Sequence, residues 1–158
     1  MSDRWMFVTA FSTVVLIVAG AFAIPQFFVY ELIKSSIFVA IAVLVFFGED
    51  RFSYMLGAIA PLLWFILDFL LGDLLGDLRT MFSWIAGRRI APLDTPLHGF
   101  SIFLGLILLI LSVKAWKREV SEKFFSKTFA ICLIISLAYI AVLAGWQLRM
   151  ISTGFRPH

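Results

Sequence analysis

The sequence is dominated by five long apolar runs joined by short polar connectors. A helix of about 20 apolar residues crosses the roughly 30 Å hydrocarbon core of a bilayer, and each run comes close to this length. Hydrophobic residues make up 62% of the 158-residue chain and charged residues 15%, too few polar side chains to cover a soluble globule. The sequence therefore predicts an all-α, polytopic transmembrane helix bundle that forms one integral membrane domain. The predicted spans are 5–24, 27–47, 52–71, 97–113 and 128–146.

Two features leave four spans as an alternative to five. Ala21, Phe22 and Ala23, near the end of the first run, resemble a signal-peptidase site, and cleavage there would remove the first span. The second run begins with polar residues, and four spans would also follow if it only re-entered the membrane. Pro25 separates the two runs, because proline donates no amide hydrogen and disfavours a helical residue before it.

The stretch 61–79 carries three aspartates, Asp68, Asp73 and Asp77, in and after an apolar run. A carboxylate at the centre of a bilayer costs about 3 kcal/mol or more and usually marks a pairing or transport role, whereas one at the headgroups costs little. Counting from residue 52 at about 1.5 Å per residue puts Asp68 about 24 Å along its helix, near the far interface. This depth weakens a transport interpretation.

Residues 73–89 predict a short amphipathic helix at the membrane surface. Asp73 and Asp77 are four residues apart and share one helical face. Apolar residues at similar spacing form another face: Leu74, Leu78, Met81, Phe82 and Ile85. Trp84 is typical of an interfacial anchor. We therefore expect these aspartates to form a solvated acidic face along the headgroups.

The same aspartates have an alternative role as ion ligands. Carboxylates are hard oxygen ligands for divalent cations, and carboxylates inside membranes also relay protons. The stretch lacks the alternating aspartates and turn glycine of a calcium loop, and no metal site is predicted from it. An acidic vestibule made by Asp68, Asp73 and Asp77 remains the transporter alternative.

Glu31 and Lys34 lie in the polar first part of the second span. Their spacing of three allows the two side chains to pair on one face of a helix. We expect an ion pair at the membrane interface, with the long lysine side chain reaching toward the headgroups. A functional or partner contact at this pair is the alternative.

His98 stands at the start of the fourth span, and the only other histidine is His158. A haem held between two histidines therefore cannot be built within the bundle. The expected role of His98 is a hydrogen-bonded residue at the interface. The alternative is a contact to a chlorophyll-type pigment or a haem, as an axial ligand. Such a pigment, or a quinone, would be held largely by partner subunits.

The connector Lys114–Lys127 is the most basic part of the chain. Basic loops next to membrane spans favour the cytoplasmic side, so we expect this connector and the N-terminus on the cytoplasmic side of a bacterial inner or cytoplasmic membrane. Anionic lipid headgroups are its expected partner. The net charge of +3 is spread over the ends of the apolar runs, which argues against nucleic-acid binding.

No nucleophile elbow, phosphate-binding loop or paired-histidine motif is present, so we do not expect an enzyme. A small, phenylalanine-rich bundle with few polar contacts favours an accessory or structural subunit packed against a larger membrane complex of respiratory or photosynthetic type. The first alternative is a pigment-, quinone- or lipid-binding subunit. The second is a small ion or solute transporter that uses the acidic vestibule.

Overall fold

The computed structural model describes residues 2–23, 25–71, 74–88, 94–121 and 125–152, and the described part is helical apart from short turns. The elements in chain order are α1 (Ser2–Ala23), the 3-10 helix η1 (Pro25–Phe27), α2 (Phe28–Phe46), α3 (Asp50–Leu71), α4 (Leu74–Ile85), α5 (Asp94–Glu119) and α6 (Lys127–Ser152). Five of these helices, α1, α2, α3, α5 and α6, are long and apolar enough to cross a membrane. The predicted fold class is therefore confirmed.

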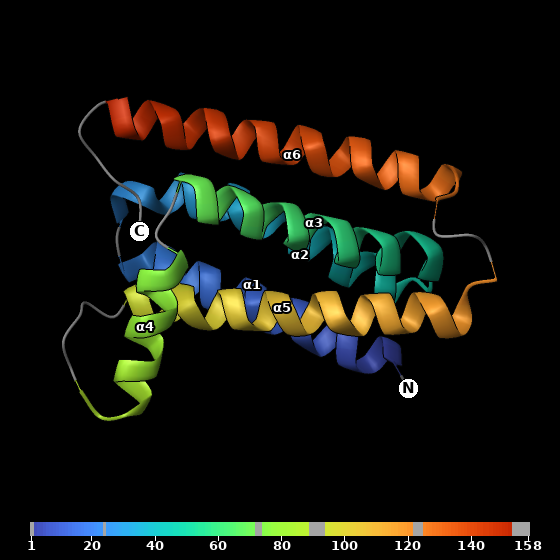
Figure 1. Cartoon of the computed structure of the whole chain (residues 1–158), viewed down its shortest axis with the longest axis horizontal. Coiled ribbons are helices and arrows are strands. Elements are labelled where there is room, and N and C mark those ends of the chain that lie inside the picture. Colours follow the sequence, from blue (N-terminus) through green and yellow to red (C-terminus); the bar gives the residue numbers. More distant parts are fainter. Residues whose placement is uncertain (1, 24, 72–73, 89–93, 122–124, 153–158) are drawn as a thin grey trace.

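The five long helices run side by side, and α4 lies across one end of the bundle (Figure 1). We call this end the α4 end. The opposite end holds the N-terminus, the α2–α3 turn and the α5–α6 connection. Helix α1 packs against α2 and α5, and α3 packs against α5 and α6. Helix α6 therefore covers the outside of α3, and its opposite side meets no other described helix.

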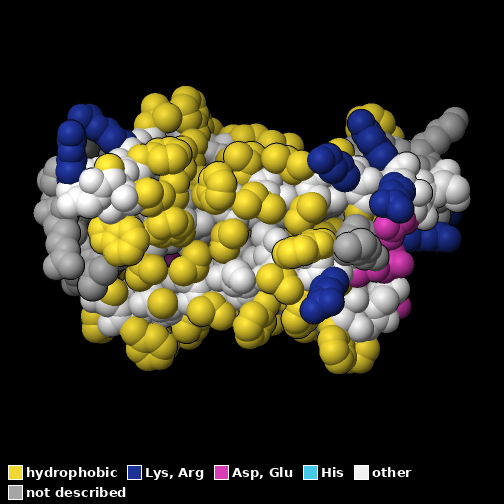
Figure 2. Space-filling model, turned by 90° about the horizontal axis from the view of Figure 1, so that it is seen from below, with side chains coloured by type: hydrophobic (Ala, Val, Ile, Leu, Met, Phe, Trp, Pro, Cys, Tyr) yellow, Lys and Arg dark blue, Asp and Glu magenta, His cyan; other side chains and the backbone are white. Residues whose placement is uncertain are grey.

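On the face shown in Figure 2, the surface between the two ends is mainly apolar, and most charged side chains lie toward the ends. Large apolar side chains are exposed on several of the long helices, among them Phe22, Phe46, Ile66 and Ile134. An apolar belt of this kind between charged ends is what the hydrocarbon core of a bilayer requires. The chain is an integral membrane protein by the length and composition of its helices.

The predicted boundaries of the first three spans agree with the helices to within about three residues, and the main differences are at the ends of the fourth and fifth, since α6 continues to Ser152 instead of ending near residue 146. Helix α5 continues to Glu119 instead of ending near residue 113. Lys114, Lys117 and Arg118 are exposed on this extension. A helix satisfies its own backbone hydrogen bonds, so it can continue past the apolar run. The first run is fully part of the bundle, since Met6, Ala10 and Thr13 of α1 are completely buried.

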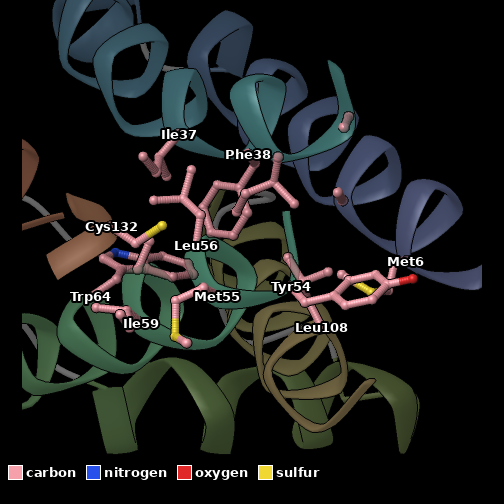
Figure 3. Close-up of a cluster of buried hydrophobic side chains, with 14 of the residues drawn as sticks. Met6, Ile37, Phe38, Tyr54, Met55, Leu56, Ile59, Trp64, Leu108 and Cys132 are labelled. Carbon is pink, nitrogen blue, oxygen red and sulfur yellow. The ribbon is translucent and has the colours of Figure 1, made fainter. Parts of the chain in front are cut away.

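The core of the bundle is aromatic and aliphatic. Figure 3 shows side chains from α1, α2, α3, α5 and α6 meeting around α3. Cys132 is a buried free thiol whose Sγ lies 3.8 Å from the Phe52 carbonyl oxygen. The rings of Phe38 and Trp64 meet edge to face with centroids 5.5 Å apart. Aromatic rings in contact prefer edge-to-face or offset-stacked geometry, so this pair restricts how α2 packs on α3.

Gly99 of α5 has no side chain, and this lets α4 dock closely on α5. A Cβ atom at Gly99 would lie 2.7 Å from the carbonyl oxygen of Asp77 and 2.8 Å from the Cβ of Met81. Real Cβ contacts are essentially never this short, so only glycine permits the observed approach. Gly99 therefore sets how near α4 comes to the bundle.

A polar contact connects three helices at the end of the bundle opposite α4. The Tyr54 hydroxyl on α3 lies at hydrogen-bond distance from Asp3 on α1 and is 2.6 Å from Glu119 Oε2 on α5. Tyr54 itself is completely buried. The two ends of the bundle are thus held by polar contacts and its middle by apolar packing.

We predict that Gly99→Ala destabilises the protein by about 1–3 kcal/mol, because the new methyl group must push α4 off α5. The free energy of unfolding is measured by denaturant titration of the purified protein in mixed micelles.

Gly145→Ala is the matched control, since no atom lies within 4 Å of the added Cβ on α6. This variant is expected to be neutral or slightly stabilising, as alanine is the better helix former. Equal stability of the two variants would contradict the close docking of α4.

Candidate functional site

Five ionisable side chains meet at the α4 end, and we call them the ionisable cluster. They are Glu31 and Lys34 of α2, Asp68 of α3, Asp77 of α4 and His98 of α5. Four separate helices therefore supply one polar centre at this end of the bundle. Such side chains are costly in a membrane protein unless they pair, and they mark a functional site by default.

Asp68 lies in the last turn of α3 and is buried, with its side chain 4% exposed. Trp64 precedes it by one turn on the same face of the helix, and the Trp64 and His98 rings meet edge to face at 5.9 Å. The predicted position near one end of the span is confirmed. Asp68 does not contribute to an open acidic surface, because its side chain is buried inside the bundle.

Asp77 corrects the sequence-based view of α4. We expected this aspartate on a solvated face, but its side chain is 2% exposed and points into the bundle. Met81, one turn later, is buried on the same face, whereas Leu75, Phe82 and Ile85 are exposed. The prediction was wrong because Gly99 allows the backbone of α4 to dock at Asp77, where His98 offers a polar partner. Asp73 lies outside the described residues.

His98 stands at the centre of the cluster. Its Nε2 atom is 3.3 Å from Asp77 Oδ2 and 3.5 Å from Asp68 Oδ2. On the other edge of the ring, Nδ1 is 3.1 Å from Lys34 Nζ. The expected hydrogen-bonded histidine is therefore present. Both ring nitrogens face ionisable side chains, and no described contact of His98 favours the alternative of a pigment or haem ligand.

Lys34 is held inside the bundle instead of reaching the headgroups. Its side chain is 1% exposed, and its ammonium group contacts Glu31 Oε1 at 2.7 Å. The predicted Glu31–Lys34 pair is confirmed, but the interfacial lysine is a wrong prediction. The ammonium also lies 5.3 Å from the centre of the Tyr30 ring, and the Tyr139 hydroxyl of α6 donates to the Lys34 carbonyl at 2.7 Å. These contacts give a lysine enough partners to remain buried.

Three atoms of the cluster converge without bonding to one another. One ligand atom from each of Asp68, Asp77 and His98 lies within 4.8 Å of the other two. Among the described residues, neither Asp68 Oδ2 nor His98 Nε2 has a hydrogen-bond partner, although both are buried. Buried polar atoms are normally satisfied, so an unsatisfied pair aimed at one point requires an explanation. The donor set, two carboxylates and an imidazole, is one that binds metal cations.

The sequence already indicated this cluster, but the positions of its five residues were not considered together. In a five-span topology, residues 31, 34, 68, 77 and 98 all fall at the same end of the bundle. Trp64 was missed altogether, although its spacing of four from Asp68 already placed it on the same face. Each polar residue was assigned separately to the interface, where water or headgroups would satisfy it.

Comparisons of the chain with family models, with curated proteins and with solved structures found no match. The functional argument therefore depends on the geometry of the ionisable cluster.

We predict that Lys34→Met lowers the free energy of unfolding by about 3–5 kcal/mol, because it leaves Glu31 without its buried partner. Adding Glu31→Gln to Lys34→Met removes the unpaired charge and is expected to restore much of that loss. Unfolding in mixed micelles measures all variants.

Lys114→Met is the matched control, since Lys114 is exposed on α5, and its effect is expected to stay within about 0.5 kcal/mol. If Lys34→Met and Lys114→Met had the same small effect, the buried pair would make no contribution to stability.

Proposed function

We propose that this protein is a small cation-handling membrane protein, which takes up a cation at the ionisable cluster. The observation that carries the proposal is the convergence of buried ionisable side chains from four different helices at one point. Of the sequence-based hypotheses, the small ion transporter with an acidic vestibule is the nearest to this geometry. In the present proposal the cation binds at a buried site covered by α4 and not in an open acidic vestibule.

The balance of charge in the cluster favours a cation. Lys34 is paired with Glu31, and the buried carboxyl group of Asp68 faces the imidazole of His98. A carboxylate in apolar surroundings costs several kcal/mol unless a positive charge compensates it. A bound cation supplies that charge, and the carboxylate oxygens supply ligands for it.

The position of the cluster indicates the side from which a cation enters. Asp68 is one turn from the end of α3, and α4 is the only described helix that lies across this end (Figure 1). Displacing α4 would open the cluster to one side of the membrane without disturbing the five long helices. We infer that α4 controls access to the site.

The basic connector supports an orientation for this site. Lys114, Lys117, Arg118 and Lys127 are exposed at the end opposite α4. By the excess of basic residues in cytoplasmic loops, we propose that this end and the N-terminus face the cytoplasm of a bacterial inner membrane, with anionic headgroups around the connector. The cluster then takes its cation from the outer side.

We predict that at least one cation of a panel of Na+, K+, Mg2+, Ca2+, Mn2+ and Zn2+ stabilises the wild-type protein and not Asp68→Asn. A cation at about 100 times its Kd stabilises the folded state by about 2.7 kcal/mol. Thermal unfolding in detergent, followed by tryptophan fluorescence, measures the shift in Tm.

Glu49→Gln is the control for this experiment, because Glu49 is an exposed acid in the turn at the opposite end of the bundle. This variant should respond to the cation as the wild-type protein does. If no cation raised the Tm of the wild-type protein, or if Asp68→Asn responded equally, the proposed function would be wrong.

The role of an accessory subunit is a second candidate, and α6 is the observation that favours it. This helix packs on α3 with one side, while large apolar residues cover the other: Ile131, Ile134, Leu137, Val142 and Leu148. A larger membrane subunit fits such a face, as does lipid. Purification from the native membrane in a mild detergent distinguishes them, since a subunit brings stoichiometric partners with it.

A further inference from the structure

We propose that the cation is a divalent transition metal and that Asp68, Asp77 and His98 are its three protein ligands. This inference rests on the proposed function and names the class of ion that the site takes. It uses the Oδ2 atom of each aspartate and the Nε2 atom of His98, which face one another from α3, α4 and α5.

The distances within the triad fit a small metal ion. Metal–ligand bonds of about 2.0–2.1 Å in tetrahedral geometry place neighbouring ligand atoms about 3.3–3.4 Å apart. His98 Nε2 is 3.3 Å from Asp77 Oδ2 and 3.5 Å from Asp68 Oδ2. A typical N–H···O hydrogen bond is shorter, about 2.7–3.2 Å between donor and acceptor. The spacing is therefore that of ligands around a shared ion.

Burial gives the second, independent reason. The side chains of Asp68 and His98 are 4% and 10% exposed, so water does not readily satisfy their polar atoms. Asp68 Oδ2 and His98 Nε2 nonetheless form no hydrogen bond with any described residue. The two atoms face each other at 3.5 Å, and a metal coordinated between them would satisfy both together.

The ligand types select the class of metal. Calcium and magnesium prefer shells made only of oxygen, whereas an imidazole nitrogen with carboxylates suits Zn2+, Mn2+, Fe2+ and Co2+. Two carboxylates also neutralise the charge of one divalent ion. Three protein ligands leave a fourth position open, which a water molecule or another small ligand fills in zinc sites of this kind.

The second ring nitrogen determines how His98 becomes a ligand. A metal on Nε2 requires the ring proton on Nδ1, and Lys34 Nζ lies 3.1 Å from Nδ1. An ammonium group only donates hydrogen bonds, so Lys34 must turn away from Nδ1 when the metal binds. Glu31 already holds this ammonium at 2.7 Å and provides the place to which it turns.

The deciding experiment is titration of the detergent-purified protein with Co2+, followed by visible absorption. His158→Ala and a histidine-free affinity tag form the background, because His158 is the only other histidine. We expect a saturable cobalt band in this background and in Glu49→Gln. The band is expected to be lost in Asp68→Asn and His98→Gln, with affinity falling by more than the roughly 10–100-fold that loss of an outer-shell partner costs.

A second measurement keeps the inference testable if a ligand variant fails to fold. Pulsed electron paramagnetic resonance of the Cu2+-loaded background protein detects the nitrogen of a coordinated imidazole. One histidine-type nitrogen coupling is expected, and it can come only from His98 once His158 is replaced. Absence of this coupling would overturn the assignment of His98 as a ligand.

The outcomes separate the inference from the proposed function. If Ca2+ or Na+ stabilises the wild-type protein and Co2+ does not bind, the cation-handling function stands and the transition-metal site is wrong. The site is equally wrong if Co2+ binds but His98→Gln leaves its band and affinity unchanged. If no cation binds the wild-type protein, both proposals fail.

Discussion

The contact of His98 with its ionisable neighbours is the interaction on which the α4 end of this bundle depends. One imidazole links Lys34 of α2 on one edge with Asp68 of α3 and Asp77 of α4 on the other. Because buried charges are costly without partners, each of these side chains constrains the helix that carries it. The amphipathic helix α4 is thereby held across the bundle, where Gly99 leaves room for its backbone.

The remainder of the bundle is held together by different contacts from those at the α4 end. Apolar packing around α3 fills the middle, and the Tyr54 hydroxyl joins α1 and α5 at the opposite end through Asp3 and Glu119. Helix α3 contributes to both polar ends and to the core between them. It is the most buried of the five candidate spans. A cation at the α4 end would therefore act on the helix that every other long helix except α1 contacts extensively.

The fold could be predicted from the sequence to a large extent, and the site only in part. Membrane spans depend on the hydrophobicity of consecutive residues, which is why the five helices and the 25–27 break were found. The Glu31–Lys34 pair was found for the same reason, as its spacing is local. The burial of Asp77 was not, because it depends on Gly99 and His98, which follow it by more than 20 residues along the chain. Lys34 meets His98 across 64 positions, a distance over which periodicity carries no information.

Anomalous X-ray diffraction from crystals of the Co2+-loaded protein tests the central claim most directly. The account predicts a single strong peak about 2.0–2.2 Å from His98 Nε2 and from one carboxylate oxygen each of Asp68 and Asp77. Lys34 is then expected to contact Glu31 and to have left Nδ1. A cobalt peak elsewhere, with His98 still bonded to Lys34 and no ion between the two aspartates, would contradict the account.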